Sequence, residues 1–179
     1  LRRQRQMCIR DSAWGLRGLC IASGALYFGL CSTLGMDVLP VTDTGDWGAD
    51  LLERLQRAYR AKEYDFIYVH TKAPDEMAHL GDPEKKRDVI EALDKAFAWA
   101  VKEIIPDEEV VFVLTSDHST PSGGEMIHSG EPVPLAITGR YARRDAVRHF
   151  DEIRCAAGAL GMVRGHEVMY MVLNLLDRG

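Results

Sequence analysis

Apolar positions follow two different periods along this chain, and the alternation predicts strands separated by helices. Short apolar or β-branched runs are typical of strands, whereas apolar residues three or four positions apart are typical of helices. The predicted strands are residues 16–22, 37–41, 65–70, 109–114 and 135–138. The predicted helices are residues 24–34, 49–62, 83–105, 145–160 and 166–177. This alternation favours an α/β fold with a mostly parallel sheet sandwiched by helices.

Individual segments support this assignment. Leu51, Leu55 and Tyr59 lie on one face of the predicted helix 49–62. Pro83 suits the first turn of the long helix that it begins. The continuous apolar run EVVFVL, residues 109–114, predicts a central strand covered on both faces.

Composition and charge exclude some classes of function for this chain. The chain has 179 residues, enough for one domain with a sizeable core, and its formal net charge of -5 argues against a nucleic-acid partner. The apolar region 16–34 is interrupted by Arg17, Ser23 and several glycines, so we expect no membrane span and a cytoplasmic protein. The four cysteines form no C-x-x-C pair, which favours reduced thiols, although a disulfide pair stays open.

The first residues differ from the rest. Residues 1–12, LRRQRQMCIRDS, have neither a helical nor a strand period and are rich in Arg. We interpret them as a tail, and a non-native origin stays open. The predicted domain therefore covers residues 13–179.

Two polar loops rich in Asp and His follow predicted strands. Residues 71–83 follow the strand 65–70, and residues 115–134 follow the strand 109–114. In open α/β sheets ligands bind beyond the carboxyl ends of the strands. We therefore expect the two loops to face each other across one site.

The residue types in these loops suit a metal ion. The first loop has Asp75 and His79, whose spacing of four places them on one face if the segment turns helically. The second has Asp117, His118 and His128. Carboxylate and imidazole groups bind Zn²⁺ or Mn²⁺. Each motif alone is also compatible with a solvated polar turn.

Neighbouring side chains suggest supporting roles. His70 ends the strand 65–70, and we expect it to be packed or hydrogen-bonded rather than a further metal ligand. Ser119 and Thr120 directly follow the Asp117–His118 pair. We expect them to support these ligands through hydrogen bonds.

Taken together, these motifs resemble a known enzyme family. KAPDEMAHLGDP, TSDHSTP and HSGEPVP, in this order and with GMDV, YDFIYVH and AAGALGMVRGHEVMYMVLNLL around them, resemble the archaeal-type cofactor-independent phosphoglycerate mutases. These enzymes belong to the alkaline phosphatase superfamily, so the resemblance implies an alkaline-phosphatase-like fold. It extends from Trp14 to the C-terminal segment.

The resemblance implies a role for each matching residue. Asp75, His79 and His128 correspond to the ligands of one divalent cation, and Asp117 and His118 to ligands of a second. Mn²⁺ is the expected metal, with Zn²⁺, Co²⁺ and Mg²⁺ as alternatives. Lys72 lies in the same loop as Asp75 and His79, where it could neutralise the charge of an anionic substrate, although a solvated lysine is an equally good interpretation.

The family uses further parts for which this chain shows no counterpart. These are an Asp motif, the motif of the nucleophilic Ser, and an inserted substrate-holding domain. We therefore expect a C-terminal part of the enzyme with its catalytic nucleophile unassigned.

The expected function is the interconversion of 2- and 3-phosphoglycerate in glycolysis by metal-assisted phosphoryl transfer. Another phosphotransferase or hydrolase of the superfamily, such as a phosphopentomutase, is an alternative. A degenerate, non-catalytic metal-binding domain is another. The sequence leaves the oligomeric state open.

Overall fold

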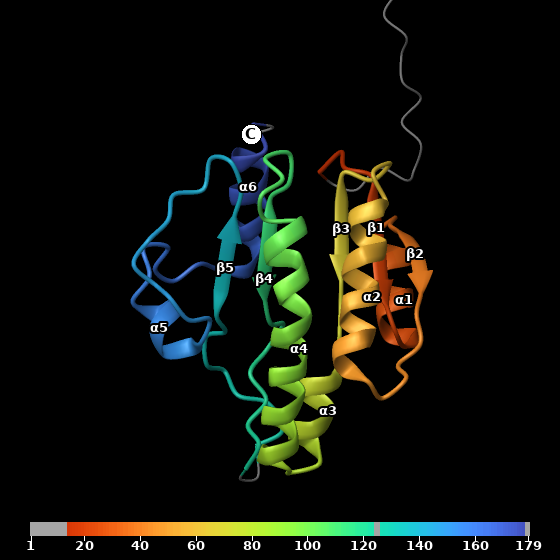
Figure 1. Cartoon of the computed structure of the whole chain (residues 1–179), viewed down its shortest axis with the longest axis vertical. Coiled ribbons are helices and arrows are strands. Elements are labelled where there is room, and N and C mark those ends of the chain that lie inside the picture. The colour runs from red at the N-terminus through yellow and green to blue at the C-terminus, as the bar shows by residue number, and fades with distance from the viewer. Residues whose placement is uncertain (1–13, 124–125, 178–179) are drawn as a thin grey trace, which may run out of the picture. The chain divides into compact units, whose positions relative to one another are not determined.

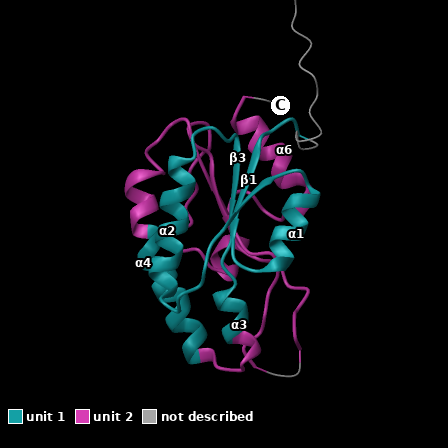
Figure 2. Ribbon diagram, turned by 90° about the vertical axis from the view of Figure 1, so that its right-hand side faces the viewer, with its two compact units in different colours: residues 1–77, 84–97 teal, residues 78–83, 98–179 magenta. Residues whose placement is uncertain are grey.

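The structure is a computed structural model that describes residues 14–123 and 126–177 (Figure 1). It divides into two compact units, residues 1–77 with 84–97 and residues 78–83 with 98–179 (Figure 2). The predicted tail, residues 1–12, lies outside the described residues.

A parallel sheet forms the centre of the first unit. Its strands are β1 (Gly18–Ala22), β2 (Asp37–Pro40) and β3 (Phe66–Val69), in the order β2-β1-β3. Helices α1 (Ala25–Thr33) and α2 (Trp47–Arg60) cover opposite faces of this sheet (Figures 1 and 2). All five residues of β1 are buried. The predicted parallel sheet sandwiched by helices is therefore confirmed.

Small residues let the layers of this unit approach closely. Helix α4 (Pro83–Glu103) runs beside α2 in its first part. A Cβ atom added to Gly48 of α2 would lie 3.0 Å from the carbonyl oxygen of Ala92 in α4. On the α1 side, Cys20 and Cys31 are buried together in a small apolar cluster.

The second unit holds an antiparallel pair of strands. Strand β4 (Phe112–Thr115) pairs with β5 (Leu135–Thr138). The prediction of a central strand over residues 109–114 was wrong, because β4 is half-buried along most of its length. The apolar run is divided: the N–H of Val110 donates to the Asp107 carbonyl in a turn, and the strand begins after it. The fully buried strand is β1 instead.

The predicted helix over residues 145–160 was also wrong. Only α5 (Glu152–Ala156) is helical in this segment. The Asp145 carboxylate accepts hydrogen bonds from the N–H groups of Val147 and Ala159, which folds the chain back on itself. Asp side chains that bind nearby backbone N–H groups compete with helix formation in this way.

The loop over residues 71–83 contains a short helix that was not predicted, α3 (Ala73–His79). Its first turn carries Pro74, which suits a helix start, and Asp75 and Glu76, which suit the positive end of the helix dipole. Gly81 follows with a φ of 67°, and its N–H donates to the Ala78 carbonyl. Glycine readily adopts this conformation and ends the helix.

The long helix and the C-terminal helix form where the sequence predicts them. Helix α4 ends two residues before its predicted end, and α6 spans Gly165–Leu175. Within residues 14–123 and 126–177, no helix is both long enough and apolar enough to cross a membrane.

Candidate metal centre

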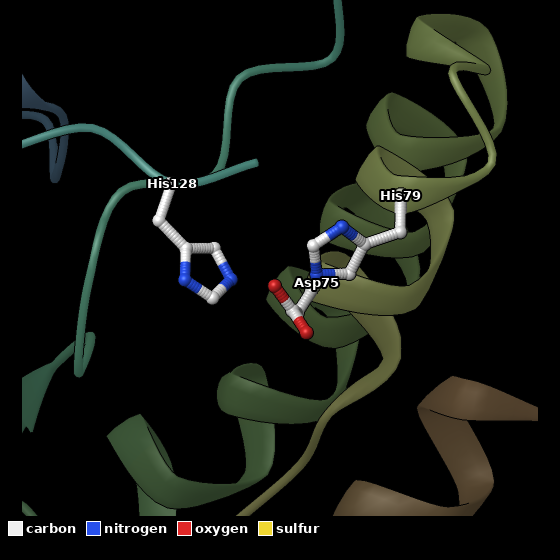
Figure 3. Close-up of side chains that lie close together, drawn as sticks. All are labelled: Asp75, His79 and His128. Atoms are coloured by element: carbon white, nitrogen blue, oxygen red, sulfur yellow. The ribbon is translucent and has the colours of Figure 1, made fainter. Parts of the chain in front are cut away.

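Helix α3 places two of the predicted ligands on the same face. Asp75 and His79 are separated by four residues, slightly more than one helical turn. Their side chains point in the same direction from α3 (Figure 3). Asp75 lies in the part of α3 counted with the first unit and His79 in the part counted with the second. The continuous helix fixes their spacing.

The loop after β4 brings two more histidines to His79. The N–H of Ser129 donates to the Ser119 carbonyl at 3.1 Å, and the two residues form an isolated β-bridge. This bridge closes the loop, so the ring centroids of His118 and His128 lie 3.9 Å apart. The rings of His79 and His128 lie 5.2 Å apart.

Asp75, His79 and His128 together form a set that fits one divalent cation. Each offers a ligand atom, and these atoms all lie within 4.8 Å of one another. Nitrogen and oxygen ligands lie about 2.0–2.2 Å from Zn²⁺ in tetrahedral geometry, so two ligands of one ion are separated by about 3.3–3.6 Å. Small side-chain rotations would bring the set into that range. One carboxylate with two imidazoles also leaves coordination positions open for a substrate oxygen.

Asp117 and His118 form a second pair beside this set. The His118 Nε2 lies 3.4 Å from the Asp117 Oδ2. The other ring nitrogen, Nδ1, lies 3.0 Å from the Thr120 hydroxyl, and Thr120 is buried. The hydrogen bond that we expect between Thr120 and His118 is therefore present. The Asp117 carboxylate also accepts a hydrogen bond from the N–H of His118, and its Oδ2 lies beside Nε2.

Lys72 lies next to the first ligand. Its Nζ is 4.0 Å from the Asp75 Oδ2, and its side chain is 43% exposed. An ammonium group in this place can approach both the Asp75 carboxylate and a negatively charged molecule in solution.

A pocket opens beside His79 in the second unit. Its volume is about 170 Å³. Its lining comes from the end of α3 and from the loop after β4, namely Ala78, His79, Gly81, Pro121, Ser122, Gly123, Met126 and Ile127. The candidate centre therefore borders a space that could hold a small ligand.

His70 is packed, as the sequence predicts. Its ring lies against Tyr27, with 3.7 Å between centroids. The sequence prediction missed the residue that holds its backbone, Arg54. The only sequence signal for a special role is its position, because Arg54 lies between Leu51 and Leu55 on the apolar face of α2.

A comparison with protein-family models places the chain in a family. The family model "Metalloenzyme superfamily" matches residues 5–175, and the chain belongs to this family.

Two curated relatives of the chain share a specific enzyme name. The chain is 40% identical over 165 residues to the 2,3-bisphosphoglycerate-independent phosphoglycerate mutase 2 of Methanocaldococcus jannaschii, covering 92% of this chain and 36% of that protein. It is 34% identical over 167 residues to the mutase of Pyrococcus furiosus, covering 92% of this chain and 40% of that protein. The predicted resemblance to archaeal cofactor-independent mutases is confirmed. The chain spans well under half the length of these relatives.

Solved structures share the fold. The PH0037 protein from Pyrococcus horikoshii matches with a TM-score of 0.83 and 32% identity, covering 93% of this chain and 51% of that one. The cofactor-independent phosphoglycerate mutase from Thermoplasma acidophilum matches with a TM-score of 0.60 and 25% identity, covering 90% of this chain and 36% of that one. The predicted alkaline-phosphatase-like class of fold is confirmed by these matches.

Proposed function

We propose that this chain forms the metal-binding part of a cofactor-independent phosphoglycerate mutase that interconverts 2- and 3-phosphoglycerate. The observation that carries the proposal is the convergence of Asp75, His79 and His128 within 4.8 Å. The His118 ring stands beside them. The names of the archaeal relatives support the substrate.

Each predicted residue has a role in this proposal. Asp75, His79 and His128 would hold one divalent cation, and Asp117 and His118 would contribute to a second. Two such cations, when bound, stabilise the charge that develops on a transferring phosphoryl group and lower the pKa of a nucleophile. Lys72 would neutralise part of the negative charge of the substrate.

The chain's own groups also orient the ligands. The Thr120 hydroxyl at His118 Nδ1 fixes the ring orientation, and Nε2 would be the nitrogen that binds an ion. A backbone bridge between Ser119 and Ser129 holds the two halves of the loop together. The nucleophile of the reaction would be a Ser, as in the family that the chain resembles, and we assign this role to no residue of this chain.

Mn²⁺ is the expected metal, because carboxylate and imidazole ligands suit it, and Zn²⁺, Co²⁺ and Mg²⁺ are alternatives. A mutase acting on phosphoglycerate belongs to glycolysis and would work in the cytoplasm.

The test is a mutase assay on the protein expressed from its complete reading frame. We expect formation of 2-phosphoglycerate from 3-phosphoglycerate that depends on added Mn²⁺. Asp117→Ala should abolish it, whereas Asp88→Ala, an exposed position on α4, should not change it. Wild-type turnover in the Asp117→Ala variant would exclude the assigned centre.

The same assay separates the alternatives. Release of inorganic phosphate without isomerisation would indicate a hydrolase of the same family. Metal binding without any turnover would indicate a non-catalytic domain.

A further inference from the structure

Arg54 is a charged residue buried in the first unit. It lies on α2 between Leu51 and Leu55, and it is only 1% exposed. A buried guanidinium is costly unless other groups compensate its charge and its hydrogen bonds. The contacts of the Arg54 guanidinium therefore indicate how its charge is compensated and which parts of the chain it holds.

Its guanidinium group joins the ends of two strands. Nη1 donates a hydrogen bond to the carbonyl oxygen of His70, at 2.6 Å, directly after β3. Nη2 forms an ion pair with Asp43, in the loop after β2. Arg54 therefore bridges the carboxyl edge of the sheet, where open α/β folds bind ligands.

Asp43 extends this bridge to the third strand. Its carboxylate also accepts a hydrogen bond from Ser23, which directly follows β1. Burial alone would raise the pKa of Asp43, but the hydrogen bonds from Ser23 and Arg54, together with the charge of Arg54, hold it below its ordinary value. The ion pair is consequently formed at neutral pH.

The His70 end of the bridge leads directly to the candidate metal centre. Only Thr71 stands between His70 and Lys72, and α3 with Asp75 begins immediately afterwards. The N–H of His70 donates to the Ile21 carbonyl, and its ring packs on Tyr27. Three contacts therefore hold His70, namely Arg54 at its carbonyl, Ile21 at its N–H and Tyr27 at its ring.

We propose that Arg54 is a positioning residue for the metal centre. By holding the His70 carbonyl it fixes the start of the segment that connects β3 to α3. The Asp75 carboxylate and the Lys72 ammonium are thereby placed at the centre. This inference rests on the proposed function in so far as it requires Asp75 to bind a metal ion.

The test compares variants that separate positioning from stability. Arg54→Gln removes the charge and the bridge. Leu55→Ala, at a neighbouring buried position of α2, lowers stability and keeps the Arg54 guanidinium that binds the His70 carbonyl. Asp43→Asn removes the charge that pairs with Arg54. Because the Asp43 side chain is half-exposed, this variant should fold even if Arg54→Gln does not.

The measurement is the dissociation constant of Mn²⁺ by titration calorimetry, together with amide hydrogen exchange over residues 71–77. We expect Arg54→Gln to weaken Mn²⁺ binding by about tenfold or more, the range found for residues that orient metal ligands. Faster exchange over residues 71–77 should accompany this loss. Asp43→Asn should show a smaller change in the same direction, and Leu55→Ala should bind as the wild type does.

The outcomes are distinguishable. Wild-type affinity in Arg54→Gln, or in Asp43→Asn if only that variant folds, would overturn the role of Arg54 and leave the metal centre intact. A loss in Leu55→Ala equal to that in Arg54→Gln would reduce Arg54 to a stability role and also overturn it. A wild-type protein that binds no Mn²⁺ would overturn both the metal centre and this inference.

Discussion

The Nδ1 atom of His118 lies 3.0 Å from the hydroxyl oxygen of Thr120. On the other side of the ring, Nε2 lies 3.4 Å from the Asp117 carboxylate. The two contacts fix the ring so that Nδ1 is held by the Thr120 hydroxyl and Nε2 lies beside a carboxylate oxygen. Metal-binding histidines are commonly oriented in this way.

Thr120→Val should therefore weaken metal binding by about tenfold, because it replaces the hydroxyl with a methyl group of similar size. Thr120→Ser keeps the hydroxyl and should bind metal nearly as well as the wild type. Titration calorimetry measures the Mn²⁺ affinity of both variants. Equal affinity in the Val and Ser variants would show that the hydroxyl does not orient His118.

Lys72→Gln should raise the KM for 3-phosphoglycerate by about tenfold, because it removes a positive charge 4.0 Å from Asp75. Lys102→Gln removes a charge from an exposed position near the end of α4 and is the control. Steady-state kinetics on the protein from the complete reading frame distinguish the two. An unchanged KM in Lys72→Gln would remove this residue from substrate binding.

The stability of the protein should fall in acid. Hydrogen bonds from the N–H groups of Ala159 and Val147 lower the pKa of Asp145, and those from Arg154 lower the pKa of Asp151. A carboxylate with a lowered pKa in the folded state adds stability at pH values above its unfolded pKa, about 3.9. This contribution is lost as the pH falls through the lower, folded pKa.

Asp145→Ala should consequently destabilise the protein at pH 7 and make less difference as the pH falls well below 4. Urea unfolding at pH 7 and at several acidic pH values measures the change. If the wild type and Asp145→Ala differ by the same free energy of unfolding at every pH, the stabilisation does not depend on the ionised Asp145 carboxylate, and this prediction is wrong.

The buried thiols should resist alkylation. Burial, followed by the hydrogen bond and charge of Cys31, raises the pKa of the Cys20 thiol to about 12. Only thiolates react rapidly with iodoacetamide. At pH 8 we expect Cys155, which is partly exposed, to be labelled before Cys20 and Cys31, the other two cysteines among the described residues.

Cys20 and Cys31 should be labelled only after unfolding in urea, and mass spectrometry of tryptic peptides identifies each site. Labelling of Cys20 in the folded protein at the rate of Cys155 would show that this part of the core opens readily.

Much of the fold follows from patterns that are visible in the sequence. The apolar segment around Cys20 and the β-branched and aromatic segment around Ile67 form paired parallel strands, as these strand-forming residue types predict. The amphipathic stripe of Leu51 and Leu55 correctly predicts the buried face of α2. These signals are strong because the energy of burial acts over many residues at once.

Other features depend on contacts that no local pattern reveals. Helix α3 has only seven residues, too few for a reliable helical period. The segment after Asp145 has a helical composition, yet the Asp145 side chain binds backbone groups that lie far apart in the sequence. The bridge from Arg54 to His70 joins residues sixteen positions apart, so only the folded chain shows it.

For the candidate site, the sequence predicts the residue types and the structure supplies their distances. Asp75 and His79 can be paired from their helical spacing alone. The approach of His128 to His79 depends on the Ser119–Ser129 bridge, which has no sequence signature.

The most direct test of the metal centre is the Mn²⁺ stoichiometry of the purified protein, measured beside His128→Ala. His149→Ala, at an exposed histidine outside the candidate site, is the matched control. We predict specific Mn²⁺ binding in the wild type and in His149→Ala, and loss of one bound ion in His128→Ala. A wild-type protein without specific binding, or a His128→Ala variant with the wild-type stoichiometry and affinity, would contradict the assignment of Asp75, His79 and His128 to one metal ion.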